Sequence, residues 1–118
     1  MHAVLEAPAK INLFLRITGR RRDGYHFLDS VFLPIDLCDR VEVKILSRPG
    51  VEVSCPSFPD LQGRNNLAWK AVELYIQKAR WPKGAEITIR KKIPVAAGLG
   101  GASSDAATVL RALDSLNP

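Results

Sequence analysis

The chain has 118 residues, of which 47% are hydrophobic and 25% are charged, so it suits one compact domain and is not a disordered chain. Its net charge of +5 favours anionic partners, namely nucleic acid, an anionic membrane surface or phosphorylated small molecules. Its two cysteines, Cys38 and Cys55, lack the spacing of a metal site or a CxxC pair, so we expect two reduced thiols.

The N-terminal residues are not typical of a signal peptide, because Glu6, Pro8, Lys10 and Asn12 interrupt any apolar stretch. No apolar run in the sequence is long enough to cross a bilayer. We therefore expect a cytoplasmic protein without a membrane partner.

The first half of the chain is typical of strands. Residues 7–18 alternate between apolar and polar side chains and predict a half-buried strand, which ends in a polar turn at residues 19–24. Residues 27–37 predict a second extended stretch, followed by a turn flanked by Asp36 and Asp39.

Two further strands are expected before the first helix. Residues 41–45 alternate and predict a third strand. The sequence Ser47-Arg48-Pro49-Gly50 is a turn signal, so residues 51–55 predict a fourth strand in a hairpin with the third.

The second half of the chain predicts a helix, a strand and a helix. Asn65 or Asn66 can cap a helix that runs to about Arg80, residues 85–90 alternate as a fifth strand, and a helix covers about residues 103–116. The order of elements predicts an α+β fold, with a mostly antiparallel sheet and the helices on one face.

The loop between the last strand and the last helix carries the strongest functional signal. Its glycines let backbone N–H groups approach an anion closely, and the helix that follows adds free N–H groups and a partial positive charge. The pattern is neither a Walker A motif nor a dinucleotide fingerprint, and a flexible turn is the alternative. The candidate phosphate-binding residues are Pro94, Val95, Ala96, Ala97, Gly98, Leu99, Gly100, Gly101, Ala102, Ser103 and Ser104.

Pro-x-x-x-Gly-Leu-Gly followed by Ser-Ser-x-Ala-Ala resembles the phosphate-binding signature of the GHMP kinases. Within that superfamily, three segments together resemble the 4-diphosphocytidyl-2-C-methyl-D-erythritol kinase family. They are residues 7–13 (APAKINL), 22–26 (RDGYH) and 98–107 (GLGGASSDAA). The resemblance covers essentially the whole chain.

The resemblance implies a fold like domain 2 of ribosomal protein S5, with residues 1–118 as the ATP-binding N-terminal domain. It implies transfer of the γ-phosphoryl of ATP to the 2-hydroxyl of 4-diphosphocytidyl-2-C-methylerythritol in non-mevalonate isoprenoid synthesis, with Mg²⁺ bound at Ser103 or Ser104. The family's catalytic aspartate lies in a Gly-Ala-Asp-Val-Pro type segment after the second helix, which this chain does not reach, and its C-terminal domain is also absent. We therefore expect the chain to be inactive by itself.

Roles for residues outside the loop also follow from the resemblance. Lys10 and Asn12 share one face of a strand about 7 Å apart; Lys10 would stabilise anionic oxygen at the reacting hydroxyl, and Asn12 would bind the methylerythritol part. Tyr25 and His26 would stack on and hydrogen-bond the cytosine. Asn66 would lie near adenine.

The alternatives are a surface lysine for Lys10, a turn aromatic on the sheet edge for the pair Tyr25 and His26, and a helix cap for Asn66, a role that can coexist with adenine contact. The run Arg20, Arg21 and Arg22 would attract the diphosphate substrate or lie in a solvated turn. Two other functions are weighed against the kinase family: another GHMP kinase acting on homoserine or mevalonate, and an S5-like RNA-binding module. No aromatic and basic platform for nucleic acid is visible.

Overall fold

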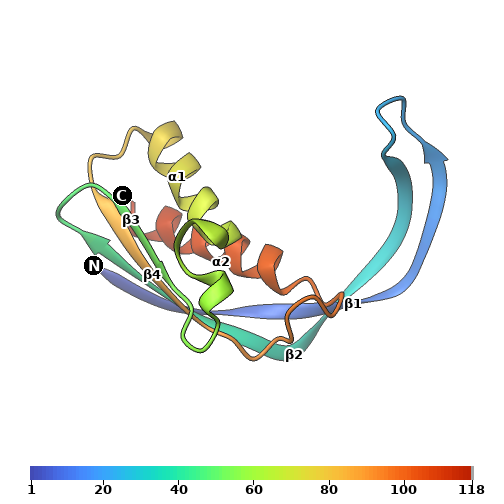
Figure 1. Cartoon of the computed structure of the whole chain (residues 1–118), viewed down its shortest axis with the longest axis horizontal. Coiled ribbons are helices and arrows are strands. Elements are labelled where there is room, and N and C mark those ends of the chain that lie inside the picture. The colour runs from blue at the N-terminus through green and yellow to red at the C-terminus, as the bar shows by residue number, and fades with distance from the viewer. Residues whose placement is uncertain (118) are drawn as a thin grey trace.

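The computed structural model describes residues 1–117, with the side chains of residues 14, 15 and 28 excepted. A four-stranded sheet with the order β1-β2-β4-β3 carries two helices on one face (Figure 1). The elements in chain order are β1 (His2–Arg20), β2 (His26–Leu46), β3 (Val51–Ser54), two short 3-10 turns (Pro59–Leu61 and Gly63–Asn65), α1 (Leu67–Ala79), β4 (Gly84–Arg90) and α2 (Gly101–Leu116). The predicted α+β class, with a mostly antiparallel sheet, is confirmed.

The core lies between the sheet and the helices. Alternate residues of β2 and β4 point to this layer, and apolar residues of both helices cover them, so water is excluded from a continuous apolar cluster. Its fully buried members include Val41, Val43, Ile87, Ile89, Val72, Val109 and Leu113.

The turn predicted between Asp36 and Asp39 does not form. β2 runs through it without interruption, and Asp39 lies inside the strand with its side chain fully buried. The carboxylate of Asp39 accepts hydrogen bonds from the amides of Lys92 and Ile93, at 2.7 and 2.9 Å. These donors allow an acidic residue, which sequence patterns assign to a turn, to remain in a buried strand.

The predicted hairpin between the third and fourth strands is also wrong. β3 pairs in parallel with β4, and β4 pairs antiparallel with β2, so β4 occupies the place next to β2. The reason is burial: Ala85, Ile87 and Ile89 of β4 are all fully buried, whereas β3 is a short strand at the sheet edge.

β1 and β2 form a long hairpin whose distal half leaves the body as a curved arm (Figure 1). The register shifts between Pro8 and Lys10, between Asn12 and Phe14, and between Ile17 and Gly19, and such bulges bend and twist a strand pair. The half-buried strand predicted at residues 7–18 is therefore buried only at its start: Ala7 and Ala9 are buried, but Leu13 and Ile17 are exposed.

Candidate functional site

The phosphate-loop candidate joins β4 to α2 and has an unusual backbone. Ala96, Gly98 and Gly100 all have positive φ, at 59°, 75° and 69°. Alternating left-handed residues turn successive N–H groups towards one side, which is how backbone concavities bind anions. α2 begins at Gly101, two residues earlier than predicted, so Ser103 and Ser104 lie within its first turn.

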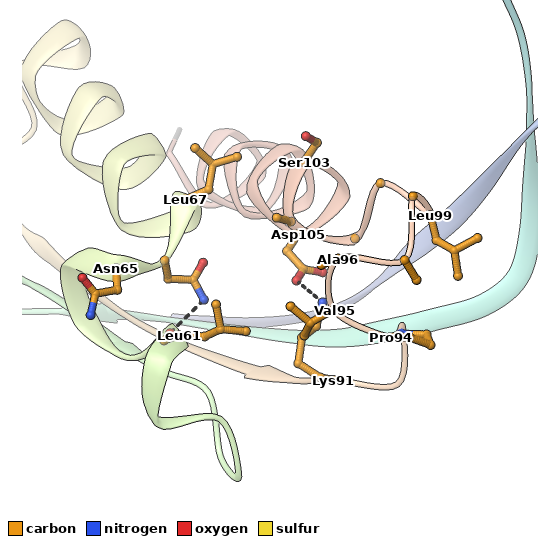
Figure 2. A pocket seen from close by; sticks show the side chains of 16 residues that line it. Leu61, Asn65, Leu67, Lys91, Pro94, Val95, Ala96, Leu99, Ser103 and Asp105 are labelled. Carbon is orange, nitrogen blue, oxygen red and sulfur yellow. Dashed lines mark hydrogen bonds and ion pairs between the residues drawn. The ribbon is translucent and has the colours of Figure 1, made fainter. Parts of the chain in front are cut away.

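Beside the loop lies a cavity of about 340 Å³ (Figure 2). The loop and the start of α2 form one side, and the segment before α1 forms the other. Ser103 lines the cavity and Ser104 does not. The N-terminal end of a 16-residue helix therefore borders a space of small-ligand size, where its free N–H groups favour an anion.

Lys10 lies directly against this loop. Its Nζ donates hydrogen bonds to Asn12 Oδ1 at 2.7 Å and to the carbonyl of Gly98 at 3.1 Å. Its backbone amide donates to the carbonyl of Leu99 at 2.9 Å. The structure thus brings together Lys10, Asn12 and the glycine loop, which the sequence singled out separately.

The stem of Lys10 also explains the glycine at position 100. A Cβ built on Gly100 would lie 3.0 Å from Lys10 Cε, and the φ of 69° already disfavours any other residue. On the other side, the ammonium is 5.2 Å from the centre of the Phe32 ring, within the range of a cation–π contact. Lys10 is therefore held in place from several directions.

Asn66 is the N-cap of α1 and lines the cavity. Its Oδ1 accepts from the amide of Ala68 at 3.0 Å, and its Nδ2 donates to the carbonyl of Leu61 at 3.0 Å. The predicted capping role is confirmed, while a contact with adenine stays a prediction.

Tyr25 and His26 lie at the tip of the arm, apart from the loop (Figure 1). Tyr25 is 71% exposed, so the alternative of an aromatic packed on the sheet edge is wrong. Arg21 forms an ion pair with Asp23 at 2.7 Å and lies 5.8 Å from the Tyr25 ring centre. Arg20, Arg21 and Arg22 are all exposed at this tip.

A buried ionic cluster under the loop was missed by the sequence analysis. Lys91 Nζ lies 2.6 Å from Asp39 Oδ2 and 3.1 Å from Asp105 Oδ2, and all three side chains are at most 5% exposed. Figure 2 shows the pair of Lys91 and Asp105 at the cavity. The only available signal was a lysine just before the glycine loop and an aspartate just after it.

Burial, together with the neighbouring Asp39, raises the pKa of Asp105 to about 7 against the opposing effect of Lys91. Burial also acts on Asp39, but hydrogen bonds with Asp105, Lys91 and the two backbone amides hold its pKa below the usual value. Burial would lower the pKa of Lys91, yet its two acidic partners raise it above the usual value. At neutral pH, Lys91 and Asp39 are therefore charged and Asp105 is close to its midpoint.

No helix among residues 1–117 is both long and apolar enough to span a lipid bilayer.

Comparisons with known proteins show what the chain is similar to. Residues 66–118 match the family described as GHMP kinases N terminal domain. A 4-diphosphocytidyl-2-C-methyl-D-erythritol kinase of Citrifermentans bemidjiense is 46% identical over 95% of this chain and 40% of the relative. One from Anaeromyxobacter sp. (strain K) is 48% identical over 96% of this chain and 36% of the relative. The chain thus spans about 40% or less of the length of these relatives.

Comparison with solved structures shows the same similarity. A crystal structure of 4-(cytidine 5'-diphospho)-2C-methyl-D-erythritol kinase matches with a TM-score of 0.83 and 46% identity, over 98% of this chain and 41% of that one. A homoserine kinase from Cytophaga hutchinsonii matches with a TM-score of 0.69 over 98% of this chain and 35% of that one; at 18% identity this shows the fold alone. The chain is therefore similar, over nearly all of its length, to part of the proteins named 4-diphosphocytidyl-2-C-methyl-D-erythritol kinase, and its second half matches the GHMP kinases N terminal domain.

Proposed function

We propose that residues 1–118 are the ATP-binding N-terminal domain of a cytoplasmic kinase of the non-mevalonate isoprenoid pathway. The full-length protein would transfer the γ-phosphoryl of ATP to the 2-hydroxyl of 4-diphosphocytidyl-2-C-methyl-D-erythritol. The names of the relatives at 46–48% identity support this substrate. The remainder of such a protein would supply the aspartate that accepts the hydroxyl proton.

One observation carries the proposal: the ammonium of Lys10 is fixed at the glycine loop by Asn12 and the Gly98 carbonyl. A cation held there lies next to phosphate oxygens bound by the loop amides. It stabilises the negative charge that develops during in-line transfer, and because it is already positioned it needs no reorganisation. Asn12, beside it, would orient the methylerythritol hydroxyls.

Magnesium fits this site with phosphate oxygens as its main ligands. Residues 1–117 contain no group of three or more His, Cys, Asp or Glu that could hold a metal by themselves. Mg²⁺ usually keeps several waters and binds through phosphates with one or two protein oxygens. The Ser103 hydroxyl, which lines the cavity, is the better placed of the two serines to contribute one. Bound Mg²⁺ would neutralise charge on the phosphates.

The substitution Lys10→Ala in the full-length protein tests the role of the lysine. We expect the turnover number to fall roughly 10²- to 10³-fold, because a fixed electrostatic partner of the transition state is lost, while ATP affinity changes much less. Lys10→Met, which keeps the stem against Gly100, should behave similarly. Lys44→Ala removes an exposed lysine of β2 and is the matched control. Turnover near that of the control would refute the role.

The substrate is tested by a kinase assay with 4-diphosphocytidyl-2-C-methyl-D-erythritol, homoserine and mevalonate in parallel. Phosphorylation of the cytidine compound alone is the expected result. Preference for either simpler alcohol would assign the protein to another branch of the GHMP kinases. Titrations with RNA and with ATP separate the kinase from an RNA-binding module.

A further inference from the structure

The glycine loop is fixed to the body at its middle by Lys10, but its two ends have a separate attachment. Asp39 on β2 accepts hydrogen bonds from the amides of Lys92 and Ile93, which lie just before the loop. Through its other oxygen, Asp39 accepts from Lys91 Nζ at 2.6 Å. The start of the loop is therefore tied to the central sheet.

The same ammonium reaches the far end of the loop. Lys91 Nζ donates to Asp105 Oδ2 at 3.1 Å, and Asp105 lies in the first turns of α2, directly after the loop. The contact is close-packed: a Cβ built on Gly101 would lie 3.1 Å from Lys91 Nζ. One lysine thus joins the segment before the loop to the helix after it.

The carboxylate of Asp105 is costly to keep in this position. The Asp105 side chain is 97% buried, and its Oδ1 has no hydrogen-bond partner among the described residues. A buried polar atom without a partner destabilises the folded state, and an apolar residue would avoid that cost. Through Oδ2, Asp105 accepts a hydrogen bond from Lys91, and its carboxyl also lies beside that of Asp39.

We propose that Asp105 is a positioning residue of the nucleotide site, which acts through Lys91 to hold the two ends of the phosphate loop at a fixed separation. The inference rests on the proposed function in so far as the loop binds ATP. The preorganised loop presents its amides to the phosphates without first being ordered, and that order favours binding. Asp105 itself is not expected to touch the nucleotide, because its free oxygen is buried.

The decisive variants are Asp105→Asn and Asp105→Ala. Asparagine keeps the shape but loses the charge, so the bond to Lys91 weakens, and alanine removes it. Asp114→Asn, on the exposed side of the same helix, is the matched control. Backbone order parameters from ¹⁵N relaxation report on the loop in the nucleotide-free chain, and calorimetry with ATP and MgCl₂ gives the dissociation constant.

In the wild type and in Asp114→Asn, the amides of residues 95–100 should have order parameters near the rigid value of about 0.85. In Asp105→Ala they should fall towards about 0.6, while those of α1 and β4 stay unchanged. The dissociation constant for ATP should rise roughly three- to ten-fold in Asp105→Asn and further in Asp105→Ala, as expected for a weakened charge-assisted bond.

Two results would overturn the proposal: loop order that is unchanged in both variants, or order lost equally in α1, β4 and the loop. The second would mean that Asp105 serves general stability. If wild-type chain failed to bind ATP at all, the proposed function would fail, while the relaxation data on the free chain would still decide the role of Asp105. Asp105→Asn is included because it is expected to fold, since Asp39 still neutralises Lys91 in this variant.

Discussion

Asp39, Lys91 and Asp105 form a buried cluster whose net charge depends on its protonation state. With Asp105 protonated the cluster is neutral; with Asp105 ionised it carries one uncompensated negative charge in the interior. Cys55, which directly follows β3, is a further ionisable group near this cluster. Burial raises the pKa of its thiol, so the thiol stays neutral at and below neutral pH. Between about pH 4 and pH 7, only Asp105 of this cluster is expected to change its charge.

The stability of the chain should therefore depend on pH through Asp105. Its pKa is about 7 in the folded state and 3.8 in the unfolded reference, so the folded state binds a proton that the unfolded state has lost. Stability from this group is complete below pH 4 and falls as the pH rises to 7, by an amount on the order of a few kcal/mol. Asp105→Asn has no such proton, so it should gain stability over the wild type from pH 5 to pH 8.

Urea unfolding of both proteins at four pH values measures this difference directly. The difference between variant and wild type should be smaller at pH 5 than at pH 7 and should level off above about pH 7. Asp114→Asn should show a difference that does not vary with pH. A wild type more stable than Asp105→Asn at pH 8 would contradict the assigned ionisation. The variant thus combines higher stability with a weaker nucleotide site, which a residue of purely structural importance would not do.

At the scale of elements, sequence patterns correctly predicted the features that depend on residues close together in the chain. The helix capped by Asn66, the strand at residues 84–90 and the glycine loop each follow from side chains close in sequence. The partner of β3 could not be predicted, because it depends on which apolar strand is buried deepest. Likewise, Asp39 is a strand residue only because two amides and a lysine more than 50 positions away satisfy its carboxylate.

The candidate site likewise contains residues that could be predicted from local sequence and contacts that could not. Lys10, Asn12 and the loop were each predicted, but their mutual contact arises from the fold. Lys91 was not predicted, since a lysine after a strand is ordinarily a solvated side chain and nothing local indicates its burial.

Within the loop, two glycines offer a matched comparison. Gly98 and Gly100 both have positive φ, so alanine at either position introduces similar backbone strain, of about 1 kcal/mol. A Cβ at Gly98 meets nothing within 4 Å, whereas one at Gly100 meets the stem of Lys10. Gly100→Ala should therefore displace the ammonium and lower turnover of the full-length protein roughly ten-fold or more beyond Gly98→Ala.

Steady-state kinetics of the two variants, with unfolding curves to confirm similar stability, provide the measurement. Equal turnover in Gly98→Ala and Gly100→Ala would show that the contact with Lys10 is not what requires glycine at position 100.

At the scale of the whole molecule, the β1–β2 hairpin carries different candidate site residues near its middle and at its tip. Lys10 lies where the hairpin meets the loop, and Tyr25 and His26 lie at the tip of the arm, which curves towards the side of the sheet that carries the helices (Figure 1). Apolar residues on the arm, including Leu13, Phe27 and Phe32, are more than half exposed. Under the proposed function, this arrangement predicts that binding of the nucleotide phosphates and binding of the cytosine can be altered separately.

Tyr25→Ala and His26→Ala in the full-length protein should each raise the KM for the cytidine substrate roughly ten-fold, because stacking or a base-edge hydrogen bond is lost. The KM for ATP should stay unchanged, since the loop and Lys10 lie near the middle of the hairpin, away from its tip. Tyr25→Phe, which keeps the ring, should retain most of the affinity, and His2→Ala, an exposed histidine at the start of β1, serves as the control. An unchanged KM for the cytidine substrate would remove the arm tip from substrate recognition, and equal rises for both substrates would mean that the arm and the loop are coupled rather than independent.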